Sequence, residues 1–164
     1  MTVGYHEEQR FEWFWRGATL IPVLIVGYGV YRQAWLGRPF APNSLLWPAF
    51  IVTLVVAAWF TRIKLITEVR EGGLWINYVA LWPERLIMWD QIQSVESITY
   101  RPVRDFGGWG VRWGARGIVY NARGDRGARM VLASGERVLV GSQRADELAR
   151  SIAEHAGRQA AASS

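Results

Sequence analysis

The stretch PFAPNSLLWPAFIVTLVVAAWFT, residues 39–61, contains no charged side chain and lies between Arg38 and Arg62. A helix that crosses a bilayer needs about 20 consecutive, predominantly apolar residues. A buried helix of a soluble protein is the alternative, but an amphipathic soluble helix carries a polar face, and this stretch has none. The stretch therefore predicts a membrane-spanning helix, and the rest of the chain is organised around it.

A second apolar stretch, GATLIPVLIVGYGVY, residues 17–31, lies between Arg16 and Arg32. It is shorter, but aromatic side chains flank it on both sides, as in helices that end at the two bilayer interfaces. These are Trp13, Phe14, Trp15, Tyr31 and Trp35. The loop of residues 37–44 has turn-forming prolines and no room for a domain. We therefore expect residues 17–61 to form a two-helix transmembrane hairpin with both ends on one side.

The distribution of charge indicates which side. Basic residues are more frequent beyond the outer ends of the hairpin than in its loop, which favours cytoplasmic termini. The outer set is Arg10, Arg16, Arg62, Lys64 and Arg70, and the loop set is Arg32 and Arg38. A cleaved signal peptide is disfavoured because acidic residues precede the first apolar stretch. Neither stretch contains Asp, Glu, Lys, Arg or His, so anchoring is favoured over transport.

After the second apolar stretch the hydrophobic pattern alternates as it does in β-strands. Turn signals separate the strand-like segments, among them Gly72–Gly73 and residues 133–136. The segments are residues 65–72, 73–82, 84–89, 92–102, 111–122, 128–135 and 136–142. A helical pattern follows, with Ser142 as a candidate N-cap and Gly157 as its end. We expect residues 158–164 to be a disordered tail.

Three segments carry a resemblance: EEQRFEWFW (residues 7–15), FGGWGVRWGARGIVYN (106–121) and GERVLVGSQRADELARSI (135–152). With the element order above, the chain resembles small bacterial membrane proteins in which a two-helix hairpin is followed by a pleckstrin-homology-like (PH-like) domain. The resemblance implies a membrane α-helical hairpin plus an α+β or all-β domain at residues 62–157. That domain would be a bent antiparallel β-sandwich of about seven strands with a C-terminal capping helix. It also implies the bacterial inner membrane, but no catalytic or ligand residues.

The N-terminal residues 1–16 suggest a helix. Glu8, Glu12 and Arg16 stand at four-residue spacing, which supports helices through side-chain pairs. Aromatic residues beside them favour an interfacial helix that leads into the bilayer. A docking strip for the β-domain or for a partner protein is the alternative.

The glycine-rich stretch FGGWGVRWG, residues 106–114, raises the question of a phosphate-binding loop. A dinucleotide fingerprint that starts at Gly108 would need a third glycine where Trp113 stands, and no Gly-Lys-Ser/Thr occurs. Glycine in a strand pattern marks a bulge or bend instead. We therefore expect β architecture, with Trp109 or Trp113 filling the core. A surface that touches lipid or a partner is the alternative.

Basic residues gather between residues 101 and 129. The seven arginines are Arg101, Arg104, Arg112, Arg116, Arg123, Arg126 and Arg129. Beside an anionic leaflet such a run would hold a tethered domain against the headgroups. A solvated β surface and a nucleic-acid contact are the alternatives, although nucleic acid is the least favoured. The arginines are the candidate contact residues for anionic lipid or a partner protein.

Chemistry-bearing residues are scarce. The chain has no cysteine and two histidines, His6 and His155, far apart in the sequence. No serine has the context of a nucleophile elbow. The sequence thus predicts no enzyme, no cofactor and no metal site. It predicts a membrane-tethered binding or scaffold module. The alternative is a structural subunit of a membrane complex, with close packing at Gly17, Gly27 and Gly29 making the hairpin its working surface.

Overall fold

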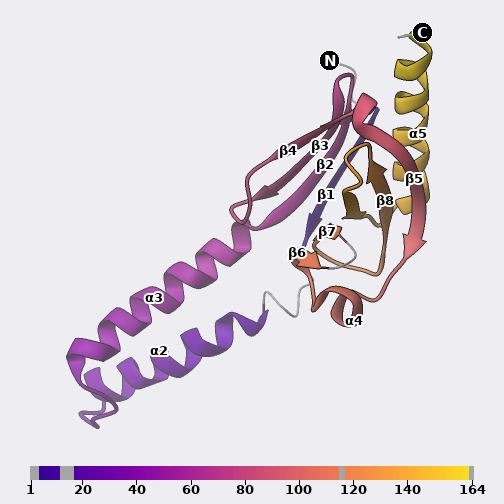
Figure 1. Cartoon of the computed structure of the whole chain (residues 1–164). Helices are drawn as coiled ribbons and strands as arrows, with labels where there is room; N and C mark the ends of the chain where they lie inside the picture. Colours follow the sequence, from indigo (N-terminus) through magenta and orange to yellow (C-terminus); the bar gives the residue numbers. More distant parts are fainter. Residues whose placement is uncertain (1–3, 12–16, 115–116, 163–164) are drawn as a thin grey trace. The chain divides into compact units, whose positions relative to one another are not determined.

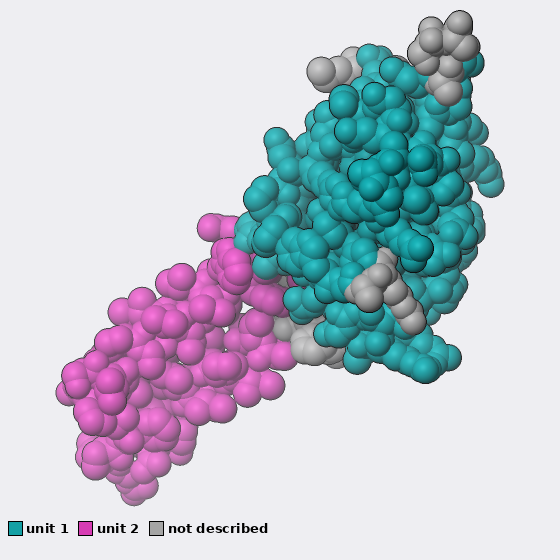
Figure 2. Space-filling view, in the orientation of Figure 1, with its two compact units in different colours: residues 1–10, 64–164 teal, residues 11–63 magenta. Residues whose placement is uncertain are grey.

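The computed structural model describes residues 4–11, 17–114 and 117–162 (Figure 1). The chain divides into two compact units, coloured separately in Figure 2. The helical unit is Phe11–Ile63, and the β unit comprises the residues up to Arg10 together with Lys64 and the residues after it. The β unit is therefore discontinuous in sequence, whereas the expected domain at residues 62–157 was continuous.

The helical unit is a hairpin of two apolar helices, as the sequence predicts. They are α2, Leu20–Ala34, and α3, Asn43–Arg62. A Cβ on Gly29 would come within 2.6 Å of the Phe40 ring, so glycine lets the loop pack against α2. The Gln33 side chain then accepts a hydrogen bond from the backbone N–H of Phe40 at 3.2 Å. By length and composition α3 suffices to cross a membrane, whereas α2 is shorter.

The first sheet of the β unit has four antiparallel strands in the order β1-β2-β3-β4. Their bounds are β1 Tyr5–Arg10, β2 Lys64–Arg70, β3 Gly73–Val79 and β4 Arg85–Met88. Arg70 is the register partner of Gly73, so the turn between β2 and β3 is Glu71–Gly72, one residue earlier than predicted. Side chains along β2 alternate between buried and half-buried, which gives the sheet one face toward the core.

The predicted N-terminal helix is wrong where the structure describes it. Tyr5–Arg10 forms a strand whose residues alternate between buried and exposed. The inward residues are Tyr5, Glu7 and Gln9. Two of these three are polar, so no hydrophobic alternation is visible in the sequence. The rest of the predicted helix, with Glu12 and Arg16, lies outside the described residues.

The second sheet has five strands in the order β5-β8-β9-β7-β6. Their bounds are β5 Ile92–Thr99, β6 Gly110–Gly114, β7 Gly117–Asn121, β8 Arg126–Leu132 and β9 Arg137–Gly141. One expected strand, residues 111–122, is instead the hairpin β6–β7. The expected antiparallel pairing also fails at one place, because β7 runs parallel to β9. The short helices η1, Trp89–Gln91, and α4, Pro102–Phe106, flank β5.

The C-terminal helix α5 spans Ala145–Ala162 and packs on β5 and β8 (Figure 1). Its own Leu148 and Ile152 are fully buried. The helix continues through Gly157, so neither the predicted end nor a disordered tail at residues 158–162 is correct. Apolar side chains from both sheets form the core with it: Leu65, Val69, Leu74, Ile76, Val119, Met130, Val138 and Val140.

The glycine-rich stretch is a bend, as predicted. Gly107 ends α4 in the left-handed conformation with φ of 73°, and β6 begins at Gly110. The expectation that a tryptophan of this stretch fills the core is wrong. Trp109 is half-buried and donates to the Gly124 carbonyl at 3.2 Å. Trp113 is 55% exposed.

Candidate functional site

All six arginines of the predicted contact run that the structure describes are exposed: Arg101, Arg104, Arg112, Arg123, Arg126 and Arg129. Arg116 lies outside the described residues. The six do not form one cluster, since they are spread over α4, β6, β8 and the loop before β8. Arg101 and Arg104 line a shallow hollow of about 500 Å³ at α4, and the other four described arginines do not line it.

Two of these arginines are engaged by acidic neighbours. Arg126 pairs with Asp146 of α5 at 2.7 Å, and Arg129 pairs with Glu96 of β5 at 2.7 Å. Within the described part of the chain, the other members make no ion pair: Arg101, Arg104, Arg112 and Arg123. The arginines of α4, β6 and the loop are therefore better placed for an external anion than those of β8.

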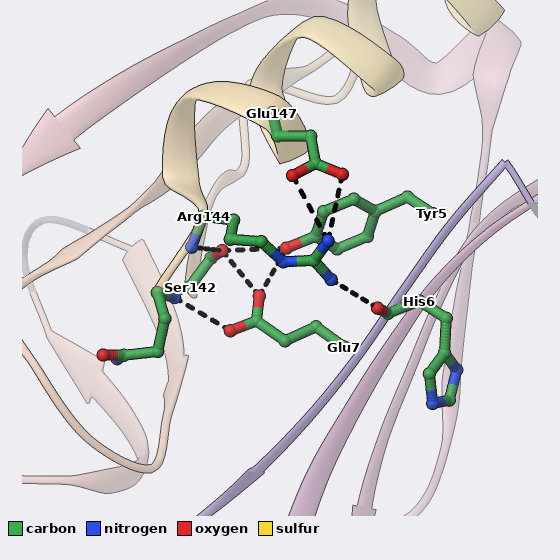
Figure 3. A network of polar contacts seen from close by, with 7 residues as sticks. Tyr5, His6, Glu7, Ser142, Arg144 and Glu147 are labelled. Atoms are coloured by element: carbon green, nitrogen blue, oxygen red, sulfur yellow. Dashed lines mark hydrogen bonds and ion pairs between the residues drawn. The ribbon is translucent and has the colours of Figure 1, made fainter.

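A polar network joins β1 to the start of α5 (Figure 3). Glu7 is 7% exposed, and its carboxylate accepts hydrogen bonds from the Ser142 hydroxyl at 2.6 Å and the Gln143 backbone N–H at 2.8 Å. The Tyr5 hydroxyl also donates to it. The Arg144 guanidinium donates to the His6 carbonyl at 2.6 Å and lies over the Tyr5 ring.

This network has a structural role. Glu7 places a negative charge at the N-terminus of α5, where the helix dipole favours it. Burial and the neighbouring carboxylate raise the pKa of Tyr5, so its phenol stays a donor. Ser142, predicted as the N-cap, accepts instead from the Arg144 N–H at 2.9 Å, and the first helical bond runs from the Leu148 N–H to the Arg144 carbonyl. Among the described residues, no histidine side chain joins the network to activate the serine.

A second buried network holds the β6–β7 hairpin to both sheets. The Asn121 side chain accepts from the Gly110 N–H at 2.9 Å and donates to the Tyr100 hydroxyl at 3.0 Å. The backbone carbonyl of Asn121 accepts from the Tyr78 hydroxyl at 2.9 Å. Burial raises the pKa of Tyr100 to about 12. These groups satisfy one another, so the network fixes the bend instead of offering a binding site.

One end of the β unit exposes two tryptophans that touch each other. Trp82, in the turn between β3 and β4, is 43% exposed, and its ring meets Trp113 of β6 edge-on with centroids 4.7 Å apart. Leu81 beside them is 36% exposed. Nearby, Arg85 donates two hydrogen bonds to the Glu136 carboxylate at 2.8 and 2.6 Å. This pairing lowers the pKa of Glu136.

The histidines do not mark a site. His155 lines a shallow hollow of about 620 Å³ beside Trp89, and its Nδ1–H donates to the Ser151 carbonyl at 2.7 Å. His6 pairs with Glu68 at 3.1 Å. Among the residues that the structure describes, no three histidine, cysteine or acidic side chains gather as metal ligands.

Comparison of the chain with models of known protein families gives no match, and comparison with curated proteins gives none either. The site must therefore be interpreted from its own geometry.

Sequence reasoning missed the two features that distinguish this surface. The Trp82–Trp113 contact joins the β3–β4 turn of the first sheet to β6 of the second, and no local pattern connects the two residues. The sequence predicts a helix around Glu7. Polar residues occupy inward as well as outward positions of β1, so no alternation of polarity marks this strand.

Proposed function

We propose that the protein is an integral membrane protein of the bacterial inner membrane, in which a two-helix anchor carries a cytoplasmic PH-like binding module. The observation that carries this proposal is the insertion of the apolar hairpin between two paired strands. Arg10 ends β1, Lys64 begins β2, and the two are register partners. The chain thus leaves the first sheet at Arg10, forms the two apolar helices, and re-enters the same sheet at the neighbouring Lys64.

The strand order supports the PH-like part of the proposal. The hairpin of β6 and β7 lies between β5 and β8 in the chain. Without it, a four-stranded sheet, a three-stranded antiparallel sheet of β5, β8 and β9, and the C-terminal helix α5 remain. The resemblance implies seven strands and a capping helix, so this strand order supports the proposal. In this protein the anchor is an insertion after the first strand.

The surface of the hairpin supports the membrane part. Apolar side chains point outward along both helices, for example Leu24 at 70% and Val55 at 60% exposure. Such a surface is costly in water and favourable in hydrocarbon. Outward aromatic residues near the loop, Tyr31 and Trp35, fit an interfacial belt.

The ligand of the module is proposed to be anionic. Arg101, Arg104, Arg112 and Arg123 are exposed and make no ion pair among the described residues. Each basic residue near an anionic leaflet contributes about 1 kcal/mol of attraction. The headgroups of the membrane that holds the anchor are the nearest source of such anions, and an acidic partner protein is the other.

Labelling of introduced cysteines tests the topology, because the chain has no cysteine of its own. S44C lies at the start of α3 near the loop, and S134C lies in the turn between β8 and β9. In intact cells, a membrane-impermeant maleimide should label S44C and leave S134C unlabelled until the cells are lysed. Labelling of neither site before lysis would refute the two spans, and labelling of S134C in intact cells would refute the orientation.

The alternative function, a complex subunit that works through its hairpin, gains no support from the glycines. A Cβ on Gly27 would meet Phe50 at 3.4 Å, and Gly29 already faces Phe40. Both glycines thus serve packing inside the hairpin. Gly17 has open space around its Cβ position among the described residues.

A further inference from the structure

We propose that Trp82 and Trp113 form an interfacial anchor that inserts into the headgroup region of the bilayer and holds the β unit on the membrane. This inference rests on the proposed function, because it requires the hairpin to be embedded. Neither tryptophan is among the residues proposed to contact an anion, so the inference assigns a separate site on the β unit.

Exposure is the first observation. Large aromatic residues are normally buried, yet Trp82 is 43% and Trp113 is 55% exposed. Their rings pack edge-on at 4.7 Å, so they form one apolar projection with Leu81 instead of two isolated side chains. Tryptophan is also the side chain that concentrates at membrane–water interfaces, since its ring is apolar and its N–H is polar.

Backbone conformation is the second observation. Ala80 precedes this projection with φ of 61°, and it is the one non-glycine residue with positive φ in the described ranges. The backbone N–H groups of Leu81 and Trp82 both point back to the Tyr78 carbonyl, at 3.1 and 2.9 Å. A left-handed alanine is strained by about 1 kcal/mol. The fold thus holds a strained turn that presents Leu81 and Trp82 outward.

Connectivity is the third observation, and it names the bilayer as the occupant. The turn follows Val79, whose register partner is Lys64. Ile63 alone separates Lys64 from α3, and one extended residue spans about 3.5 Å. An embedded α3 therefore brings this end of the first sheet to the headgroup layer.

Size favours a bilayer over a protein partner. Two tryptophans offer about 300–500 Å² even when fully covered, well below the roughly 800 Å² per partner of a stable protein interface. Arg112 precedes Trp113 on β6, and successive residues of a strand point to opposite faces, so its exposed charge is not part of the aromatic projection.

The test uses the full chain reconstituted in phosphatidylcholine and phosphatidylglycerol vesicles, with a nitroxide on a single introduced cysteine. The reporter is L81C, beside the pair. The aqueous control is G72C, in the turn at the opposite end of the same sheet, and V55C on α3 reports the hairpin. Collision with dissolved oxygen relative to a water-soluble nickel complex measures depth. The same ratio is then measured for L81C with W82S and W113S, and for L81C with M88S as matched control.

We expect the oxygen-to-nickel ratio at L81C to exceed that at G72C several-fold, to fall to the G72C value with W82S and W113S, and to stay unchanged with M88S. A ratio at L81C equal to that at G72C, with V55C deep in lipid, would overturn the anchor and leave the proposed function intact. An aqueous ratio at V55C would overturn both. Low collision with both reagents at L81C would mean that protein covers the pair, which also overturns the anchor.

Discussion

Arg10 and Lys64 lie directly opposite each other as the last residue of β1 and the first residue of β2, although the helical unit Phe11–Ile63 separates them in sequence. Glu8 of β1 strengthens this junction, because its carboxylate pairs with Lys64 at 2.7 Å and with Arg10 at 2.9 Å. The first sheet of the β unit is therefore continuous across the point at which the hairpin is inserted.

Excision of the hairpin should leave a folded β unit. Opposed strand ends can be closed by a two-residue turn such as Asn-Gly, so we join Arg10 to Lys64 through that dipeptide. We expect a soluble monomer with a cooperative thermal transition. The matched control begins at Lys64 and lacks β1, which removes Tyr5, Glu7 and Gln9, and we expect it to aggregate. Equal stability of the two proteins would show that β1 is dispensable.

Loss of the Glu7 carboxylate should destabilise the β unit strongly. E7A leaves the Ser142 hydroxyl and the Gln143 N–H without their acceptor in a buried place, which we expect to cost about 3 kcal/mol. E8A is the control, because Glu8 follows Glu7 in β1 but faces outward. Its ion pairs should contribute less than about 1 kcal/mol to the free energy of unfolding. Denaturant unfolding of the full chain in micelles, followed by near-ultraviolet circular dichroism of the tryptophans, measures both. Similar losses for E7A and E8A would contradict the network.

Acid should remove the contribution of the Arg85–Glu136 pair. Arg85 lowers the pKa of Glu136 in the folded protein, so the pair stabilises fully above the unfolded pKa of about 4.3 and loses its effect as pH falls through the lower folded pKa. At neutral pH we expect E136Q to cost about 1 kcal/mol, since the pair is partly exposed. The difference from the unmodified protein should shrink in acid. A pH-independent difference in unfolding free energy would exclude the ion pair as its cause.

Gly117 should tolerate no side chain. It has φ of 103°, and a Cβ there would overlap the carbonyl oxygen of Arg137 in the parallel pairing of β7 with β9. We expect G117A to cost about 2–4 kcal/mol, because strain and overlap add. Among the described residues nothing lies within 4 Å of a Cβ on its register partner Gly114, so G114A is a matched control near zero. Hydrogen exchange of the β6–β7 amides should distinguish them. Unchanged protection in G117A would contradict the described pairing.

Anionic vesicles should capture the hairpin-excised protein in a salt-sensitive way. We expect changing Arg101, Arg104, Arg112 and Arg123 to serine to weaken co-sedimentation at low salt by more than about tenfold, from about 1 kcal/mol for each charge. Changing Arg126 and Arg129, which already pair with Asp146 and Glu96, should weaken it less. Equal binding by both sets of variants would contradict the proposal that the unpaired arginines are the main contacts with anionic lipid.

The elements that follow from local pattern were predictable. The helices α2 and α3 and the strands β2 to β5, β8 and β9 coincide with apolar runs or with alternating segments. The predictions that were wrong concern elements whose structure depends on residues far away in the sequence. β1 is a strand because β2 pairs with it, and its inward Glu7 is satisfied by residues near Ser142. The β6–β7 hairpin adds a parallel neighbour to β9 that no turn signal specifies.

The candidate site was predictable only as a list of residue types. The arginines are exposed, as a basic surface requires, but the sequence did not distinguish Arg126, which is paired, from Arg112, which makes no ion pair among the described residues. The Trp82–Trp113 contact could not be predicted from the sequence either. A tryptophan in a glycine-rich strand suggests core packing, whereas Trp113 is exposed and contacts Trp82 of the distant β3–β4 turn.

The position of β1 has a consequence for biosynthesis. Synthesis runs from the N-terminus toward the C-terminus, so β1 leaves the ribosome before its partner β2, which follows the whole hairpin, and the donors that bind Glu7 are made later still. An unpaired strand edge is prone to aggregate while it waits. Glu7 and Gln9 keep this strand hydrophilic during that interval, and both gain hydrogen-bond partners when β9 and the residues before α5 arrive. The same polar side chains that hid β1 in the sequence thus keep the nascent chain soluble until the β unit closes.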